Sequence, residues 1–267
     1  MKSSRGKILR YTIDRFTVFW VLLFFSVQLT IWYFAPPWLA AVLALPLYFA
    51  SMMSACIHHN HQHVNVFRKS WLNRVFELPL TMQTGVGPYT WVLHHNLGHH
   101  LNYLEQRDYE KGVDESRWLR KSGDKMGRLE YSAFLFVKHH FDVYQVGKKH
   151  PRIYRNYLLM RIPLYTVLAV LFWLNPANTL ILFLALPLAT LFHTCAATYE
   201  HHSGLETKDH LLASRNNTNR FYNILAQNLG YHTAHHTRPG LHWSELPAFH
   251  EQIVASIPAG QIKTTFF

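Results

Sequence analysis

The stretch FTVFWVLLFFSVQLTIWYFAPPWLAAVLALPLYFASMMSACI, residues 16–57, contains no Asp, Glu, Lys or Arg. A second stretch without these residues runs from 162 to 199. A helix of about 20 apolar residues crosses a bilayer, so each stretch is long enough for two crossings. Proline-containing breaks, APPW at 35–38 and NPAN at 175–178, divide each stretch near its middle. The sequence therefore predicts an all-α integral membrane protein whose four transmembrane helices form two hairpins, over 16–35, 38–57, 157–174 and 177–199.

Basic residues are concentrated outside these predicted spans. The 267-residue chain has a formal net charge of +11, and neither hairpin tip carries a charge. By the positive-inside rule, this distribution predicts that segments 1–15, 58–156 and 200–267 are cytoplasmic. The charge is thus explained by topology and by attraction to anionic lipid, and without a nucleic-acid-binding motif we expect no nucleic-acid partner. We expect residues 1–267 to form a single membrane domain.

Thirteen of the 20 histidines fall in four short windows, at 58–63, 94–100, 199–202 and 232–236. The first and third windows each follow the end of a hairpin, and the other two lie in the central and C-terminal segments. Because four spans return the chain to the same side, all four windows can meet at one cytoplasmic site. We therefore expect a helical cytoplasmic cap that holds a metal site, with the amphipathic stretch 118–145 forming some of its helices.

The spacing within the windows is that of helix faces, on which residues i, i+3 and i+4 are neighbours. At i, i+4 stand His59 with His63 and His95 with His99, whereas His100 is turned about 100° from His99. The last window places His232, His235 and His236 at i, i+3 and i+4. Two histidines on one face can share a metal ion while an adjacent third reaches a second ion. Imidazole suits iron, zinc and copper, and about nine imidazoles are enough for two ions.

Other classes of protein fit these residues less well. A metal carrier needs ionisable residues along its spans, and only Arg161, which must snorkel or pair, and His193, which a hydrogen bond in the core would explain, lie there. A zinc protease of the HExxH type is disfavoured because that motif is absent. The chain also has no dinucleotide-binding fingerprint and no CxxCH haem motif, so electrons would have to come from a separate donor.

The order of the motifs HxxxH, HxxxHH and HxxHH, interleaved with two transmembrane hairpins, resembles the integral-membrane fatty acid desaturase and hydroxylase superfamily. The element at 95–100 matches the second histidine box of that family and is similar to an element of bacterial alkane hydroxylases, with His94 where those enzymes have Glu. The stretch YEHHSGL at 199–205 looks like another of their elements. The first box also contains His58 and His61, so the sequence leaves open whether His58, His59 or His61 provides its ligand. The resemblance implies these metal ligands: His59, His63, His95, His99, His100, His201, His232, His235 and His236.

The resemblance also implies two iron ions, O2 and a membrane-bound lipid or fatty-acyl substrate. An external donor such as ferredoxin, rubredoxin or cytochrome b5 would supply electrons, and the basic surface suits an acidic donor. Desaturation of a fatty-acyl chain is the leading hypothesis, and a fatty-acid or alkane hydroxylase on the same scaffold is the alternative.

One departure from the family pattern stands at Ala197, where the family has an Asn four residues before the extra histidine. Carboxylates should accept hydrogen bonds from the ring nitrogens that do not bind metal, and so fix the orientation of the ligating imidazoles. The candidates are Asp108, Glu110, Asp114, Glu115, Glu200 and Glu245, among which we favour the pair Asp114 and Glu115.

Overall fold

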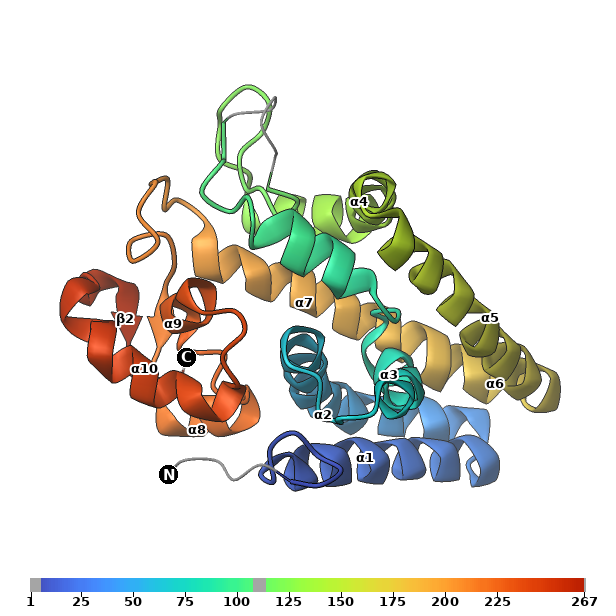
Figure 1. Cartoon of the computed structure of the whole chain (residues 1–267). Coiled ribbons are helices and arrows are strands. Elements are labelled where there is room, and N and C mark those ends of the chain that lie inside the picture. The colour runs from blue at the N-terminus through green and yellow to red at the C-terminus, as the bar shows by residue number, and fades with distance from the viewer. Residues whose placement is uncertain (1–5, 108–113, 267) are drawn as a thin grey trace.

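The computed structural model describes residues 6–107 and 114–266, and it is mostly helical (Figure 1). Asp108 and Glu110 lie outside the described residues. The helices are α1 (Asp14–Phe34), α2 (Pro37–His63), α3 (Ser70–Thr84), α4 (Arg128–Lys149), α5 (Pro151–Leu174), α6 (Pro176–Thr179), α7 (Leu186–His202), α8 (Arg220–Leu225), α9 (His232–Thr237) and α10 (Leu246–Ile253). Two π-helical segments, η1 (Val92–His99) and η2 (Leu180–Ala185), and three 3₁₀ turns, η3 (Trp243–Glu245), η4 (Val254–Ser256) and η5 (Ala259–Gln261), complete the helical structure. Strands β1 (Asn216–Asn217) and β2 (Ile262–Lys263) pair in parallel.

Four helices are long and apolar enough to cross a membrane: α1, α2, α5 and the continuous run α6–η2–α7 over Pro176–His202. This confirms the predicted all-α fold with four spans. The two hairpin tips are built as the breaks in the sequence indicated. Pro37 stands at the first position of α2, and the side chain of Asn175 caps α6 by accepting a hydrogen bond from the backbone N–H of Asn178.

Two of these helices continue well past the charge-free stretches. The second predicted span ended at residue 57, but α2 runs to His63; the fourth ended at 199, but α7 runs to His202. The helical hydrogen bonding does not stop where the apolar residues stop. The first and third histidine windows therefore lie on the last turns of α2 and α7, and the spans themselves fix their positions.

Buried polar side chains tie the spans together. Gln28 of α1 is fully buried, and its amide donates hydrogen bonds to the backbone oxygens of Met82, at 3.2 Å, and Leu182, at 2.6 Å. At the hairpin tips the amide of Asn178 donates to the carbonyls of Trp32 and Ala35. Each bond satisfies a carbonyl in an apolar surrounding, where an unpaired polar group is costly, so the register between the two hairpins is specified.

Arg161, the basic residue inside α5, is paired. One guanidinium nitrogen donates to the hydroxyl of Tyr157 at 2.7 Å, and another lies 3.3 Å from the hydroxyl of Tyr165. The guanidinium carbon also lies 4.3 Å from the ring centroid of Tyr157, a cation–π geometry.

The histidine windows gather at one end of the bundle, where α8, α9 and α10 form the cap (Figure 1). Strand β2 fastens the C-terminal segment to β1 within this cap. Residues 118–127 of the stretch expected to be helical form a loop, and the helix there, α4, begins at Arg128. Helix α4 packs on α7, where Tyr131 contacts Tyr199 and Phe136 contacts Phe192.

Candidate metal centre

Histidines from four separate segments meet at the cap end of the bundle. The ligand nitrogens of one set lie within 4.8 Å of one another, and we call this set the first histidine group: His59, His63, His95, His100 and His235. A second set meets the same criterion: His99, His202 and His236. His232 completes this second histidine group, because its Nε2 lies 3.0 Å from that of His202 and 3.1 Å from that of His236. The two groups adjoin, since the rings of His100 and His236 stack 4.2 Å apart.

Hydrogen bonding alone cannot satisfy the contacts within the second group. The Nε2 atoms of His202, His232 and His236 form a triangle with sides of 3.0, 3.0 and 3.1 Å. A neutral imidazole nitrogen either donates one hydrogen or accepts, so at least one side of the triangle has no proper hydrogen bond. Two nitrogens that ligate one ion at about 2.1 Å and at right angles are about 3.0 Å apart. The triangle therefore has the dimensions of three ligands on one metal ion.

The first group shows the same geometry. The Nε2 of His95 lies 2.7 Å from that of His59 and 3.0 Å from that of His100, which in turn lies 3.0 Å from Nε2 of His235. The Nε2 of His63 is buried and has no hydrogen-bond partner among the described residues. A buried nitrogen without a partner is costly unless a ligand satisfies it, so the donor set of this group also fits a metal ion.

The π-helical turn η1 determines which histidine group each ligand histidine of the second window joins. In a regular α-helix His95 and His99 would share a face, and we expected His100 to be the residue turned away. In η1 the backbone N–H of His100 bonds the carbonyl of His95, five residues earlier, at 2.8 Å. This wider turn places His100 beside His95 in the first group and directs His99 to the second.

Helix α9 serves both groups in the way its spacing indicated. His232 and His236 stand four residues apart on one face and belong to the second group, while the adjacent His235 reaches the first. Each group thus receives ligand nitrogens from α9 and from the 95–100 element, so one short helix bridges the two sites.

The structure places His202, and not His201, among the ligand nitrogens of the second group. The Nδ1 of His202 lies 2.9 Å from the carbonyl of Ala213, which it satisfies as a donor, so Nε2 is free to act as a ligand. His201 instead stacks on the outer side of His232, with ring centroids 3.8 Å apart. The two histidines are adjacent in the sequence, and only the rotation of α7 about its axis decides which one faces the site. In the register set by His202, the position four residues earlier is Thr198 in place of Ala197.

The first window contains four histidines, and the structure turns two of them away from the site. His58 bonds the hydroxyl of Thr84 at 3.0 Å, and His61 lies 3.4 Å from the carboxylate of Glu77; both partners belong to α3. His59 and His63, one turn apart on the opposite face of α2, are the two that enter the first group.

Asp114 fixes the orientation of His99. Its carboxylate accepts from Nδ1 of His99 at 2.7 Å, from the backbone N–H of Ser116 at 2.8 Å and from the amide of Gln106 at 2.8 Å. Burial alone would raise the pKa of Asp114, but the contacts with His99 and Ser116 bring it below its usual value. The carboxylate therefore stays ionised, and the Nε2 of His99, which is buried and has no hydrogen-bond partner within 6–107 and 114–266, is left for a metal.

Two of the other candidate carboxylates pair with basic residues instead. Glu115 pairs with Lys138 at 3.3 Å, and Glu200 pairs with Arg128 at 3.2 Å.

Five imidazoles of the two histidine groups lie outside the spans and are held in their neutral form. Burial lowers the pKa well below 6.5, and neighbouring imidazoles lower it further, at each of His95, His100, His232, His235 and His236. A neutral imidazole has a lone pair available, whereas a protonated one cannot ligate a metal. The groups are therefore ready to bind metal ions near pH 7.

Sequence reasoning missed Tyr103, which forms one wall of the second group. Its ring lies 4.3 Å from that of His236, and its hydroxyl hydrogen-bonds Nδ1 of His210 at 2.6 Å. Burial raises the pKa of Tyr103 well above its usual value, so the phenol stays protonated. No periodicity in the sequence marks this tyrosine, because its contact with His236 joins segments more than 130 residues apart.

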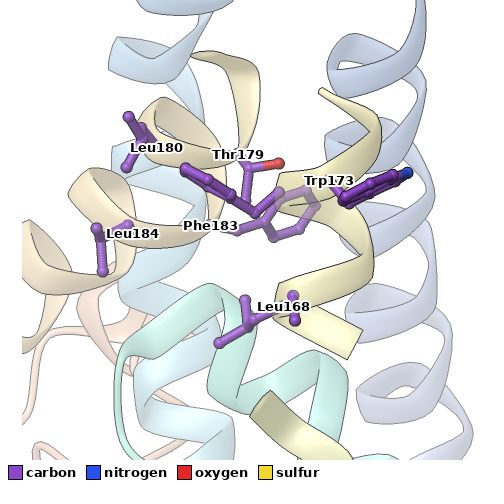
Figure 2. A pocket seen from close by; sticks show the side chains of 8 residues that line it. Leu168, Trp173, Thr179, Leu180, Phe183 and Leu184 are labelled. Atoms are coloured by element: carbon purple, nitrogen blue, oxygen red, sulfur yellow. The ribbon is translucent and has the colours of Figure 1, made fainter. Parts of the chain in front are cut away.

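An apolar pocket of about 350 Å³ opens between α5 and the α6–η2 segment, and its lining includes Leu168, Trp173, Phe183 and Leu184 (Figure 2). Thr179, on its rim, precedes His202 by 23 residues of continuous helix, or about 35 Å. The pocket therefore lies at the end of the bundle away from the histidines, and it is not the place where metal chemistry occurs.

The sequence as a whole matches the family model described as fatty acid desaturase over residues 35–266. This match covers most of the chain, so the protein belongs to that family, and it begins just before α2. No curated protein matches the chain. Membership, the four apolar helices and the histidine groups together define an integral membrane oxidoreductase of the fatty acid desaturase and hydroxylase type, a family whose members are di-iron enzymes.

Proposed function

We propose that the protein desaturates fatty-acyl chains, using O2, two external electrons and two iron ions. The observation that carries the proposal is the pair of adjoining groups of buried imidazoles, each with nitrogens about 3 Å apart. One iron would be held by the first histidine group. The other would be held by His99, His202, His232 and His236, with His202 in the position for which we expected His201.

An iron pair in such a site supplies the oxidising power needed to take hydrogen from an unactivated methylene. The overall reaction turns –CH2–CH2– into –CH=CH– while O2, two electrons and two protons become two molecules of water. The protein's own part is to hold and orient. Asp114 fixes the ring of His99, Ala213 fixes that of His202, and burial keeps the ligands neutral and excludes bulk water.

Hydroxylation of a fatty acid or alkane is the second candidate, because it differs only after the first hydrogen has left. It is favoured by the likeness of the 94–100 and 199–205 elements to alkane hydroxylases. By that likeness, His201 of the 199–205 element would be the ligand, whereas the ligand nitrogen that lies in the second histidine group belongs to His202.

We further propose that residues 1–267 act as one domain with the histidine groups on the cytoplasmic side. The positive-inside distribution supports this orientation. A soluble or membrane-bound donor, such as ferredoxin, rubredoxin or cytochrome b5, would deliver the electrons there. The formal charge of +11 favours an acidic donor, whose rate of reduction of the enzyme should fall as salt is raised.

Metal content and product mass test the proposal. Purified protein should contain about two iron ions per chain, and His202→Ala should lower this content while His201→Ala, its matched control, should not. Membranes containing the protein, given an acyl substrate, O2 and a reductant, should form a product two mass units lighter than the substrate. A product sixteen units heavier would establish the hydroxylase instead, and zinc alone in freshly prepared protein would refute the di-iron site.

A further inference from the structure

Helix α4 has two apolar faces, of which only one is packed inside the protein. The inner face buries Tyr131, Leu135, Val143 and Val146 against α7 and η1. The opposite face carries a row of large apolar side chains that are between 46 and 73 % exposed, and we call it the outer stripe: Leu129, Phe134, Val137, Phe141 and Tyr144. An apolar row of this size on a water-facing surface promotes association, so it needs a covering.

The position of α4 along the length of the spans indicates what covers the outer stripe. Its inner face packs on α7 through several side chains, among which Phe136 contacts Phe192 and Tyr131 contacts Tyr199. Counted from Pro176, where this span begins, Phe192 and Tyr199 lie about 24 and 35 Å along the helix. The hydrocarbon core of a bilayer is about 30 Å thick, so α4 is attached to α7 at the level where hydrocarbon gives way to headgroups.

The connection of α4 to α5 supports the same placement. Only His150 separates the end of α4 from Pro151, the first residue of a span, so the C-terminus of α4 must lie at the membrane surface. Four exposed basic residues flank this junction: Lys148, Lys149, Arg152 and Arg155. Such side chains extend toward anionic headgroups.

We propose that α4 is an interfacial helix whose outer stripe rests among the acyl chains of the bilayer, with the basic junction at the headgroups. This goes beyond the proposed function, since it holds whichever reaction the enzyme performs. Leu93 and Leu97 of η1 pack on Val143 and Val146 of α4. The second histidine window is therefore separated from lipid by the thickness of a single helix.

The test uses the full chain in nanodiscs of phosphatidylcholine and phosphatidylglycerol. Nitroxide labels are attached at Val137→Cys and Phe141→Cys after Cys56 and Cys195 are replaced by alanine. Accessibility to O2, which partitions into lipid, is compared with accessibility to a water-soluble nickel chelate. Ile162→Cys on α5 is the lipid-facing reference, and Lys121→Cys, in an exposed loop, is the water-facing one.

Labels at 137 and 141 should favour oxygen over nickel, as the label at 162 does, and opposite to the label at 121. Preference for nickel at both positions would overturn the proposal. So would shielding from both reagents combined with a short label-to-label distance between two chains, because a second copy would then cover the stripe. Unchanged iron content of each labelled variant shows that the chain is folded, which separates this test from the question of the reaction.

Discussion

Replacing Asp114 by asparagine should weaken metal binding in the second histidine group without unfolding the protein. The side chain is 1 % exposed, and it accepts three hydrogen bonds, one of them from Nδ1 of His99 at 2.7 Å. Asparagine keeps the volume but removes the charge and offers an N–H where Gln106 or Ser116 needs an acceptor. Loss of such a partner typically lowers metal affinity by 10- to 100-fold, or about 1.4 to 2.7 kcal/mol.

The effect can be measured by titrating metal-free protein with ferrous iron under anaerobic conditions against a competing chelator. Glu115→Gln is the matched control, because it removes the neighbouring carboxylate, which pairs with Lys138 and not with a histidine. A double variant with His99→Ala separates the mechanisms: once His99 is gone, Asp114→Asn should cost little further affinity. If Asp114→Asn binds both ions as tightly as the control does, the assigned role of the Asp114–His99 bond is wrong.

Three further outcomes are expected. His202→Ala should reduce bound iron toward one ion per chain and abolish turnover, whereas His201→Ala should keep both ions; the reverse pattern in metal analysis would contradict the assignment. Gln28→Leu leaves two buried carbonyls unpaired and should lower the free energy of unfolding by about 1 to 3 kcal/mol, seen as a lower thermal midpoint in detergent. The five imidazoles with depressed pKa values resist protonation in the folded chain, so the unfolded state gains protons first as pH falls below about 6.5. Both the stability of the metal-free protein and iron retention should therefore decline between pH 7 and pH 5, and a flat profile in thermal melts and metal analysis would oppose this.

The sequence was a good guide wherever local pattern decides the outcome. The absence of charge over 16–57 and 162–199 predicted four spans in two hairpins, because charged side chains are costly in the hydrocarbon core of a bilayer. Helical spacing also predicted that the histidines at 232–236 could serve two metal ions, and in the structure α9 contributes His236 to one group and His235 to the other. The sequence also allowed Asp114 to be proposed as a carboxylate that orients a ligating histidine, because such an imidazole needs an acceptor for its second nitrogen.

Where two histidines are adjacent, the sequence could not choose between them. The sequence does not distinguish His201 from His202. The rotation of α7 about its axis, set by its packing on α2 and α4, turns His202 toward the second histidine group. We expected His99 to lie beside His95 and His100 to be turned away, but the structure has the reverse. The reason is that η1 is a π-helical turn, a backbone conformation that residue spacing does not reveal.

What the sequence determined by itself, then, is the number of membrane crossings, the class of ligand and the family, because these depend on hydrophobicity, residue type and motif order. What only the tertiary structure decided is which imidazole belongs to which histidine group and which helix faces are left exposed. Those outcomes depend on angles between helices that are far apart in the chain. A rotation of α7 by one residue, about 100°, is enough to exchange His202 for His201.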